Sequence, residues 1–584
     1  MGKLELLPNE IIIQCFKYLN IFDIFHSFDQ LNSRFNKLIR NIPLYLNFEN
    51  VRKRIFDQFC TEILLNPEMK QHIYSLNLSN KDSCGQIELF LKLFSLNEFS
   101  NLQSLSLIDI QEDDVILLKS MLPLIPQLYH CHLMYHRHLM IFNDKINETL
   151  SALPMSQLQT LSVSKLELDL TPTNQISSVT KLTINYYYYI PLSYLFKYMP
   201  MLKYLHIGKL YLNNTASIKY DNCAGHLKEL IIDDFEYPFE YFEMLVKQTP
   251  NLKILKISAS IHKSIINANA WEYLIKTSLP YLNIFIFKFE IYHGGQEHND
   301  ITDMFKQFQS DFWQIEHHWH TVYVLDINFA LIFTIPYYSD TYDLVWYTDS
   351  YSNKSVNHFN VHDKVTNLKL HNNLSIKKYP YYFSNVRELS IAYLWPSDIN
   401  DRLFTEENII YFKEKINLSK LKQLNLSSYS IETSILLQIL IESPRLSEMT
   451  LDTDLIRSFF NNSELCEYLS KMIKTLHIIA HSGYHNMEKF YETFSSLEIL
   501  HCGFVRMSSE NDWNFWISLI NHLSQFSTIS LCNISTTWIY EEKFFSQLQN
   551  EATNRNLIFR FIPPHKNKSQ HIQTELQIWI DDKK

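Results

Sequence analysis

The histidines and cysteines are the residues with the most obvious potential for chemistry, and neither set has the spacing that such chemistry needs. The densest histidine group, Glu316-His317-His318-Trp319-His320, lacks the His-Glu-x-x-His order of a zinc site and is followed by no second ligand group. The eight cysteines include no Cys-x-x-Cys pair, so neither a zinc module nor a disulfide framework is indicated. We therefore expect no metal site and a reducing compartment, the cytoplasm, with the nucleus also open.

The sequence also lacks the motifs of common enzymes. Its eight glycines form no Walker or dinucleotide-binding pattern, and no Gly-x-Ser-x-Gly elbow occurs. The cysteines carry no signature of a nucleophile. We expect no catalytic residue, no cofactor and no enzymatic activity; an α/β enzyme whose site lacks these signatures is the least favoured alternative.

Composition and charge restrict the partners. The 584 residues are 46% hydrophobic and 20% charged, which indicates a chain that folds almost throughout. A formal net charge of −10 has the wrong sign for tracking phosphates, so nucleic acid is not expected. The longest apolar stretch, 328–336, is far shorter than the roughly 20 residues of a membrane span, and Glu5 and Glu10 interrupt any signal-type core. Neither membrane insertion nor export is predicted.

Three short helical patterns separated by turn signals occupy residues 4–39. Apolar residues recur every three or four positions at Ile11, Ile12, Cys15, Phe16 and Leu19, then at Ile24 and Phe28, then at Leu31, Phe35, Leu38 and Ile39. So small a unit buries too little of its surface to be secure alone. Part of its apolar surface must therefore face a partner, which is either the rest of this chain or another protein.

The order of these residues resembles the F-box. Leu7-Pro8-Asn9-Glu10 is followed by a Phe-x-x-Leu helix end at Leu19, by Asp23-Ile24 and by Arg34-Phe35. Phe35 stands where the family often has Trp. The resemblance implies binding of a Skp-type adaptor, and through it a cullin, by Leu7, Pro8, Ile11, Ile12, Phe16, Leu19, Ile24, Phe28 and Phe35. Burial of the same side chains inside the three-helix unit is the alternative.

Beyond residue 72 the pattern apolar-x-x-apolar-x-apolar recurs at intervals of about 25 residues, often after Pro or Asn. Its last two apolar residues would lie on one face of a short strand. Helical stretches such as 191–199, 238–248 and 432–441 lie between copies. The copies are Leu102-Leu105-Leu107, Leu128-Cys131-Leu133, Leu158-Leu161-Val163, Val179-Leu182-Ile184, Leu202-Leu205-Ile207, Leu227-Leu230-Ile232, Leu252-Leu255-Ile257, Val365-Leu368-Leu370, Val386-Leu389-Ile391, Leu421-Leu424-Leu426, Leu446-Met449-Leu451, Ile473-Leu476-Ile478, Leu497-Leu500 and Phe526-Ile529-Leu531.

An F-box followed by such repeats resembles the F-box/leucine-rich-repeat class of substrate receptors. The fold class that this implies is α/β, with a three-helix F-box followed by an irregular leucine-rich-repeat solenoid, or horseshoe. The Asn or Cys that usually follows the strand is mostly missing here. The expected domains are the F-box at 1–48, a helical linker or cap at 49–72, the solenoid at 73–560 with an irregular insertion at about 290–364, and a C-terminal tail at 561–584. Within the insertion, 293–296 reads as a loop and Trp319-x-x-Val322-x-Val324 as a degenerate strand.

The resemblance implies the substrate-recognition subunit of a Skp–cullin–F-box ubiquitin ligase, with the repeats binding an unknown protein target. In a solenoid, residues that flank the buried strand positions face the concave surface. The candidate target-binding residues are Tyr204, His206, Glu229, Lys256, Glu388, Gln423 and Asn425. Tyrosines 186–189 are either exposed aromatic anchors or, at alternate positions, part of the core. The alternative function is a ligase-independent scaffold in which the N-terminal helices only cap the repeats.

Overall fold

The structure is a computed structural model, and it describes most of the 584 residues. The described residues are 3–16, 19, 21–28, 31–49, 51, 53–81, 85–125, 127–136, 146, 149–166, 177–188, 192–211, 224–293, 298–325, 329–344, 349–351, 361–370, 379, 381–391, 403–404, 406–426, 430–480, 487–504, 531–536, 546, 550, 553–554, 558–562 and 574–579. They form a mixed α/β fold with large parallel sheets. The chain divides into two compact units, Met1–Phe287 (unit 1) and Lys288–Lys584 (unit 2).

Short helices occupy the N-terminal segment, as its apolar spacing predicts. The elements are η1 (Lys3–Leu6), α1 (Asn9–Phe16), α2 (Ile21–Phe28), α3 (Ser33–Asn41), β1 (Leu44–Asn47), α4 (Lys53–Leu65) and η2 (Pro67–His72). Helix α3 starts after Asn32, whose side chain accepts a hydrogen bond from the Phe35 backbone N–H at 3.0 Å. The strand β1 was not expected, because residues 44–47 fall inside the predicted F-box. Leu44 and Leu46 are buried and Tyr45 and Asn47 exposed, which is the two-residue period of a half-buried strand.

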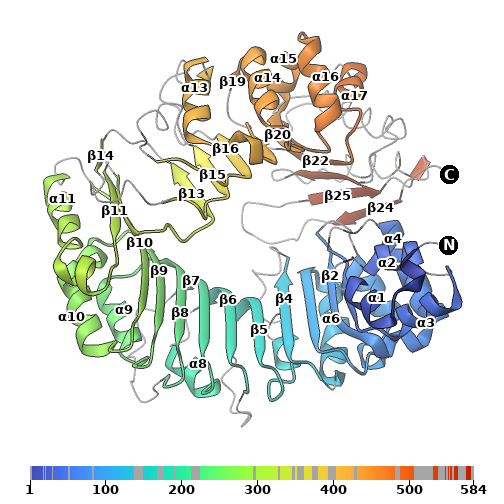
Figure 1. The fold of residues 1–584 in the computed structure, drawn as a ribbon, viewed down its shortest axis with the longest axis horizontal. Helices are drawn as coiled ribbons and strands as arrows, with labels where there is room; N and C mark the ends of the chain where they lie inside the picture. Colours follow the sequence, from blue (N-terminus) through green and yellow to red (C-terminus); the bar gives the residue numbers. More distant parts are fainter. Residues whose placement is uncertain are drawn as a thin grey trace. The chain divides into compact units, whose positions relative to one another are not determined.

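The sheet of unit 1 consists of parallel strands in chain order (Figure 1). Its strands after β1 are β2 (Ile73–Ser79), β3 (Ser104–Ile110), β4 (His130–Tyr135), β5 (Thr160–Leu166), β6 (Lys181–Tyr188), β7 (Tyr204–Tyr211), β8 (Glu229–Phe235), β9 (Ile254–Ser260) and β10 (Ile284–Tyr292), which spans the boundary of the unit. The sheet therefore begins at residue 44 and not, as predicted, at 73. Two further copies of the repeat pattern went unrecognised in the sequence, Ile73-Leu76-Leu78 and Leu282-Phe285-Phe287; all six residues are buried.

The pairing register places equivalent repeat positions opposite one another. One buried row of central residues crosses the sheet through Leu76, Leu105, Cys131, Leu161, Leu182, Leu205, Leu230 and Leu255. Alternate residues on these strands are buried and half-exposed, so one face of the sheet is packed and the other, here called the open face, is accessible.

At the position after the strand, where leucine-rich repeats usually have Asn or Cys, this chain has a buried apolar residue. It lies three residues after the last apolar position of the copy, at Ile110, Leu166, Tyr187, Leu210 and Phe235. Large apolar side chains therefore fill this place. Tyr187 of the tyrosine run occupies this buried position and is fully buried, while its neighbour Tyr186 is 39% exposed. Tyr189 lies outside the described residues.

Helices of unit 1 connect successive strands and bury one side each. They are α5 (Gln86–Leu93), α6 (Glu112–Met121), α8 (Leu192–Tyr198), α9 (Phe239–Val246) and α10 (Ala268–Ser278), with short 3-10 turns η3 (Leu96–Glu98), η4 (Leu122–Leu124) and η6 (Lys263–Ile266). Trp271 on α10 is fully buried against Phe239 and Phe242 of α9 and Phe285 of β10, with ring centroids 4.9–5.0 Å apart. This aromatic cluster packs α9 and α10 against β10 of the sheet.

Unit 2 begins with antiparallel pairing, in the region predicted as an insertion. The elements there are α11 (His298–Gln307), the π-helix η8 (Phe312–Glu316), β11 (Thr321–Leu325), β12 (Phe329–Thr334) and β14 (Asp349–Tyr351). Strand β12 pairs antiparallel with both β10 and β11. The predicted strand around Val322 and Val324 is present, but it is not a parallel repeat strand. Of the predicted loop at 293–296, only His293 lies among the described residues.

A second parallel array follows. Its strands are β13 (Thr341–Leu344), β15 (Asn367–Leu370), β16 (Glu388–Ile391), β18 (Gln423–Asn425), β20 (Glu448–Asp452), β21 (Thr475–Ala480), β22 (Ile499–Phe504) and β23 (Leu531–Thr536), and its helices are α13 (Glu406–Lys415), α14 (Thr433–Glu442), α15 (Thr453–Phe459), α16 (Ser463–Met472) and α17 (Met487–Thr493). Two short strands, β17 (Leu403–Phe404) and β19 (Ser430–Ile431), pair separately, and η11 (Leu418–Lys420) precedes β18. Phe526 and Ile529 of the last predicted copy lie outside the described residues.

The predicted C-terminal tail is wrong in part. Residues Thr574–Trp579 form β25, which pairs antiparallel with β23 and with β24 (Ile558–Ile562). The segment Thr-Glu-Leu-Gln-Ile-Trp alternates polar and apolar residues over most of its length, which is the period of a strand.

Candidate functional site

Arg34 joins the two ends of the N-terminal motif, which lie about 25 residues apart in the sequence. Its Nη1 donates to the Glu5 carbonyl at 2.6 Å, its Nη2 to the Leu7 carbonyl, and its Nε to Asn9 Oδ1 at 2.8 Å. Asn32 Nδ2 also donates to Glu5 Oε1 at 3.0 Å. The residues that cap and begin α3 therefore hold the segment that leads into α1.

The nine predicted adaptor-binding residues divide into an internal set and a surface set. Exposed fractions of the internal set are only 1% for Ile12, 4% for Phe16, 2% for Ile24 and 0% for Phe35. Phe28 is half-buried, with ring centroids 5.1 Å from Phe16 and 5.4 Å from Phe35. The four buried side chains lie between α1, α2 and α3, as the alternative of burial inside the three-helix unit has it, and adaptor contact by them stays a prediction.

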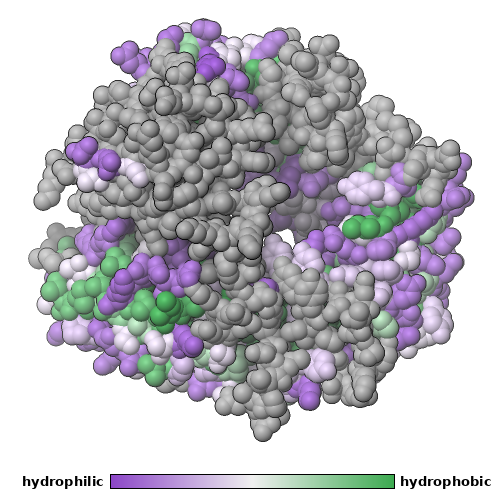
Figure 2. Space-filling model, turned by 180° about the vertical axis from the view of Figure 1, so that it is seen from behind, coloured by the Kyte–Doolittle hydropathy of each residue, from purple (hydrophilic) through white to green (hydrophobic). Residues whose placement is uncertain are grey.

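The surface set consists of Leu7, Pro8, Ile11 and Leu19. Leu7 is half-buried and Pro8 exposed, while Ile11 is 46% and Leu19 44% exposed. Sequence reasoning left Leu6 and Leu31 out of the site, although both lie in the motif; they are 85% and 54% exposed. Figure 2 shows hydrophobic side chains gathered at the left of the reversed view, on the side where the N-terminal helices lie. Exposed apolar side chains that gather on one surface are typical of interaction sites.

The N-terminal helices also pack on the rest of unit 1. The rings of Phe25 on α2 and Phe59 on α4 meet edge to face with centroids 5.3 Å apart. Phe48, directly after β1, packs against Phe56 and Phe59 at 5.0 and 5.7 Å. These contacts continue the core of the sheet into the helical segment.

Four of the predicted target-binding residues, Tyr204, His206, Glu229 and Lys256, come together on the open face of β7, β8 and β9 (Figure 1). All four are half-buried. Lys256 Nζ pairs with Glu229 Oε1 at 3.0 Å, and His206 Nε2 lies 2.7 Å from Asp233 Oδ2. Burial, together with the charges of Glu229 and Asp233, raises the pKa of Tyr204 above its usual value. The arrangement is a preorganised polar surface.

The other three predicted residues lie together in unit 2. Glu388 on β16 is opposite Gln423 on β18, and Asn425 is two residues further along β18. Glu388 Oε2 accepts a hydrogen bond from Asn367 Nδ2 at 2.8 Å. The seven predicted residues thus form one group in each unit.

Lys209 is a surface residue that sequence reasoning missed. Its Nζ lies 2.8 Å from both Asp234 Oδ2 and Glu236 Oε1, and 5.5 Å from the centre of the Tyr211 ring. Burial opposes its charge, but the hydrogen bonds and charges of the two carboxylates outweigh burial and raise its pKa. The register that places Lys209 opposite Asp234 is the signal that could have revealed this cluster.

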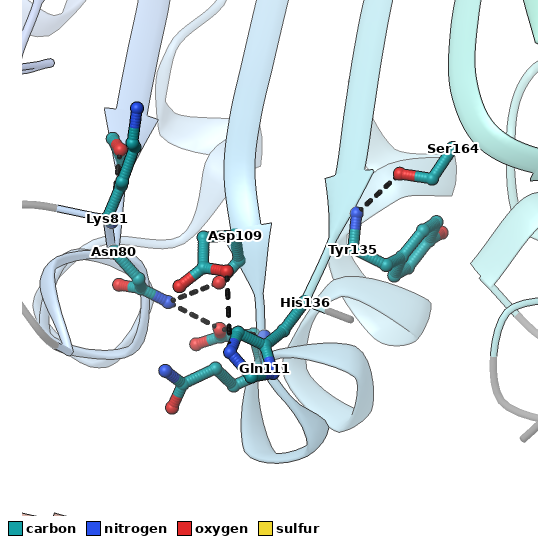
Figure 3. Close-up of polar contacts among 9 residues, drawn as sticks. Asn80, Lys81, Asp109, Gln111, Tyr135, His136 and Ser164 are labelled. Carbon is teal, nitrogen blue, oxygen red and sulfur yellow. Dashed lines mark hydrogen bonds and ion pairs between the residues drawn. The ribbon is translucent and has the colours of Figure 1, made fainter. Parts of the chain in front are cut away.

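Figure 3 shows a polar network where strands β2, β3 and β4 end. Asn80 Nδ2 donates to the Asp109 carbonyl at 3.2 Å and to Asp114 Oδ2 at 2.9 Å, and the Gln111 backbone N–H donates to the same carboxylate oxygen at 2.8 Å. The backbone N–H of Tyr135 donates to Ser164 Oγ at 2.8 Å. The contacts of Asn80 and Tyr135 each join the end of one strand to the next repeat, whereas the Gln111 contact caps the start of α6. These are structural roles.

The histidine group 316–320 is packed with aromatic rings. His317 stacks on Trp319 with centroids 4.1 Å apart and planes 12° apart, and meets Phe312 edge to face. Within the described parts of the chain, no three His, Cys, Asp or Glu side chains are placed to hold a metal ion. No helix in those parts is long and apolar enough to cross a membrane.

Comparisons with protein-family models and with curated proteins find no match to this chain.

Proposed function

We propose that this chain is the substrate-recognition subunit of a Skp–cullin–F-box ubiquitin ligase. The observation that carries the proposal is the surface formed by Leu7, Pro8, Ile11 and Leu19, which stays accessible on a helical unit whose residue order resembles the F-box. Arg34 supports it, because its hydrogen bonds hold the Leu-Pro-Asn-Glu segment in place. A Skp-type adaptor would cover this surface and link the chain to a cullin.

The role needs no catalytic side chain on this protein. A receptor that holds a target and an adaptor at once raises the local concentration of the target near the ubiquitin-charged enzyme. The parallel arrays of both units supply extended strand faces for holding a target, and the group around Tyr204, Glu229 and Lys256 is the candidate in unit 1.

Exchanging Ile11 and Leu19 together for glutamate should abolish adaptor binding. Both side chains are surface-exposed, so the double variant keeps its fold while it places two charges where apolar contact is needed. We expect capture of a purified Skp-type adaptor by the full chain to fall at least about tenfold. The matched control is Ile116→Glu with Leu124→Glu, which are 67% and 50% exposed elsewhere in unit 1. Equal capture by both double variants would contradict the proposal.

A ligase-independent scaffold is the second candidate, favoured by the packing of Phe25 on Phe59. In that role the N-terminal helices serve only to cap the sheet. Deleting residues 1–42, which leaves β1 in place, should then speed hydrogen exchange in β1 and β2 while no adaptor co-purifies with the full chain. Co-purification of an adaptor with the full chain, lost on deletion while β2 stays protected, would reject the scaffold role.

A further inference from the structure

Three exposed lysines stand in register at the start of adjacent strands in unit 1. One lysine directly precedes the first residue of each strand: Lys203 before β7, Lys228 before β8 and Lys253 before β9. The backbone N–H of Lys228 donates to the Lys203 carbonyl and that of Lys253 to the Lys228 carbonyl, both at 2.8 Å. We call these residues the lysine row.

The lysine row has no structural explanation in the contacts of unit 1. Like charges on neighbouring strands repel, so this placement costs stability. None of the three side chains has an ion-pair partner among the residues that the structure describes. The nearest acid along the row, Glu229, already pairs with Lys256 at 3.0 Å, so its charge is offset. The positive charge of the row is therefore available, in a chain whose net charge is −10.

Apolar side chains lie next to the lysine row. Tyr204, Ile254 and Ile284 are the first residues of β7, β9 and β10, one position beyond the row on the open face. Ile284 is 44% exposed, and Tyr281, just before β10, is 57% exposed. In register, Glu229 of β8, which pairs with Lys256, lies between Tyr204 and Ile254 and interrupts this apolar line. The surface thus places a line of cations beside three accessible apolar groups.

We propose that the lysine row and the adjoining Tyr204, Ile254 and Ile284 form the docking site for a short extended segment of a protein, in which acidic and apolar residues alternate. Charge complementarity selects the acidic side chains, and the three apolar groups select the side chains between them. Calling that protein the ubiquitination target rests on the proposed function; the docking site itself does not.

The spacing suits such a segment. Adjacent strands lie about 4.8 Å apart, so the three lysine backbones span roughly 10 Å. Alternate residues of an extended peptide are about 6.6 Å apart, and flexible lysine stems accommodate the difference. A stretch of about five residues that crosses the strands therefore brings two or three carboxylates to the row.

The test measures binding of a fluorescein-labelled peptide of alternating Glu and Leu to the full chain by fluorescence anisotropy, without adaptor. The variant replaces Lys203, Lys228 and Lys253 with glutamine. Its control replaces three helix lysines that pair with glutamates of their own helices, Lys92, Lys247 and Lys276, and so changes the net charge equally. We expect the row variant to bind about tenfold more weakly and the control variant within about twofold of the unaltered chain. Raising the salt concentration to about 0.5 M should weaken binding to the unaltered chain.

Several outcomes would overturn the proposal. They are absence of binding to the unaltered chain, equal loss in the two triple variants, and undiminished binding of a peptide with Gln for Glu. A single-stranded oligothymidylate that binds more tightly than the peptide, in a row-dependent way, would assign the site to nucleic acid instead. Adaptor capture by the row variant should be unchanged, so a failure here is distinguishable from a failure of the proposed function.

Discussion

Exchanging Trp271 for alanine is expected to lower the free energy of unfolding of unit 1 by about 3–5 kcal/mol, the range for removing a fully buried large aromatic side chain. The ring touches Phe239, Phe242 and Phe285, and its Nε1 donates to the Ile265 carbonyl at 2.7 Å. The variant therefore leaves a cavity between α9, α10 and β10 and an unsatisfied carbonyl. Denaturant unfolding of the full chain, with hydrogen exchange in β9 and β10 as the local readout, measures the loss.

Tyr273→Ala is the control for this prediction, because it lies on the same helix and is 65% exposed. A change of less than about 0.5 kcal/mol is expected for it. Since β10 carries Ile284 beside the lysine row, Trp271→Ala should also weaken binding of the Glu-Leu peptide. Unchanged exchange in β9 and β10 of the Trp271 variant would show that the cluster does not fasten the helices to the sheet.

Acidification is expected to destabilise unit 2 through His362. The imidazole is fully buried and stacked on Phe383, with centroids 4.7 Å apart, and its Nε2 is hydrogen-bonded to the Tyr379 hydroxyl. Its buried Nδ1 has no hydrogen-bond partner within the described residues. An imidazolium donates from both nitrogens, so protonation would leave a charged donor unsatisfied. Burial accordingly lowers the pKa of His362 to about 3.

The sign of the pH effect follows from that lowered pKa. The unfolded chain binds the proton with a pKa of about 6.5, whereas the folded chain resists it down to about 3. The contribution of the neutral His362 to the free energy of unfolding is therefore fully present above pH 6.5. It is lost as the pH falls, until the folded state also takes up the proton near pH 3. At pH 5 the expected loss is about 2 kcal/mol, from roughly 1.4 kcal/mol per pH unit over 1.5 units.

The variant His362→Phe isolates this effect, because phenylalanine suits the aromatic surroundings and does not titrate. Unfolding free energies of both proteins at pH 7.5 and pH 5 give the comparison, with hydrogen exchange in β12 and β15 as the readout within unit 2. The unaltered chain should lose about 2 kcal/mol more than the variant between the two pH values. Equal losses would mean that carboxylates alone account for the acid sensitivity.

The strands of the parallel arrays were predictable because each copy of the repeat carries its own signal. In Leu202-Leu205-Ile207 the apolar spacing alone marks which residues turn inward, and the structure buries all three. Strand β1 and the antiparallel strands β11 and β12 were harder to predict from the sequence. In β11 and β12 all residues are buried, so no polar-apolar alternation marks a face, and the pairing direction depends on residues far apart in the chain.

The candidate surfaces were only partly predictable, for a related reason. Sequence order identified the N-terminal motif but not which of its apolar residues remain accessible. Whether Phe16 or Ile11 faces outward depends on how α2 packs across α1. Similarly, the individual lysines 203, 228 and 253 are unremarkable in the sequence, and only the strand register aligns them.

The sequence by itself determined the positions of most strands and helices and the order of the N-terminal motif, because local apolar periodicity encodes burial residue by residue. Only the tertiary structure decided that Ile12, Phe16, Ile24 and Phe35 are interior while Pro8, Ile11 and Leu19 are surface, and that three distant lysines form one row. The physical reason is that exposure and proximity are properties of packed elements, which bring together residues that local periodicity cannot relate.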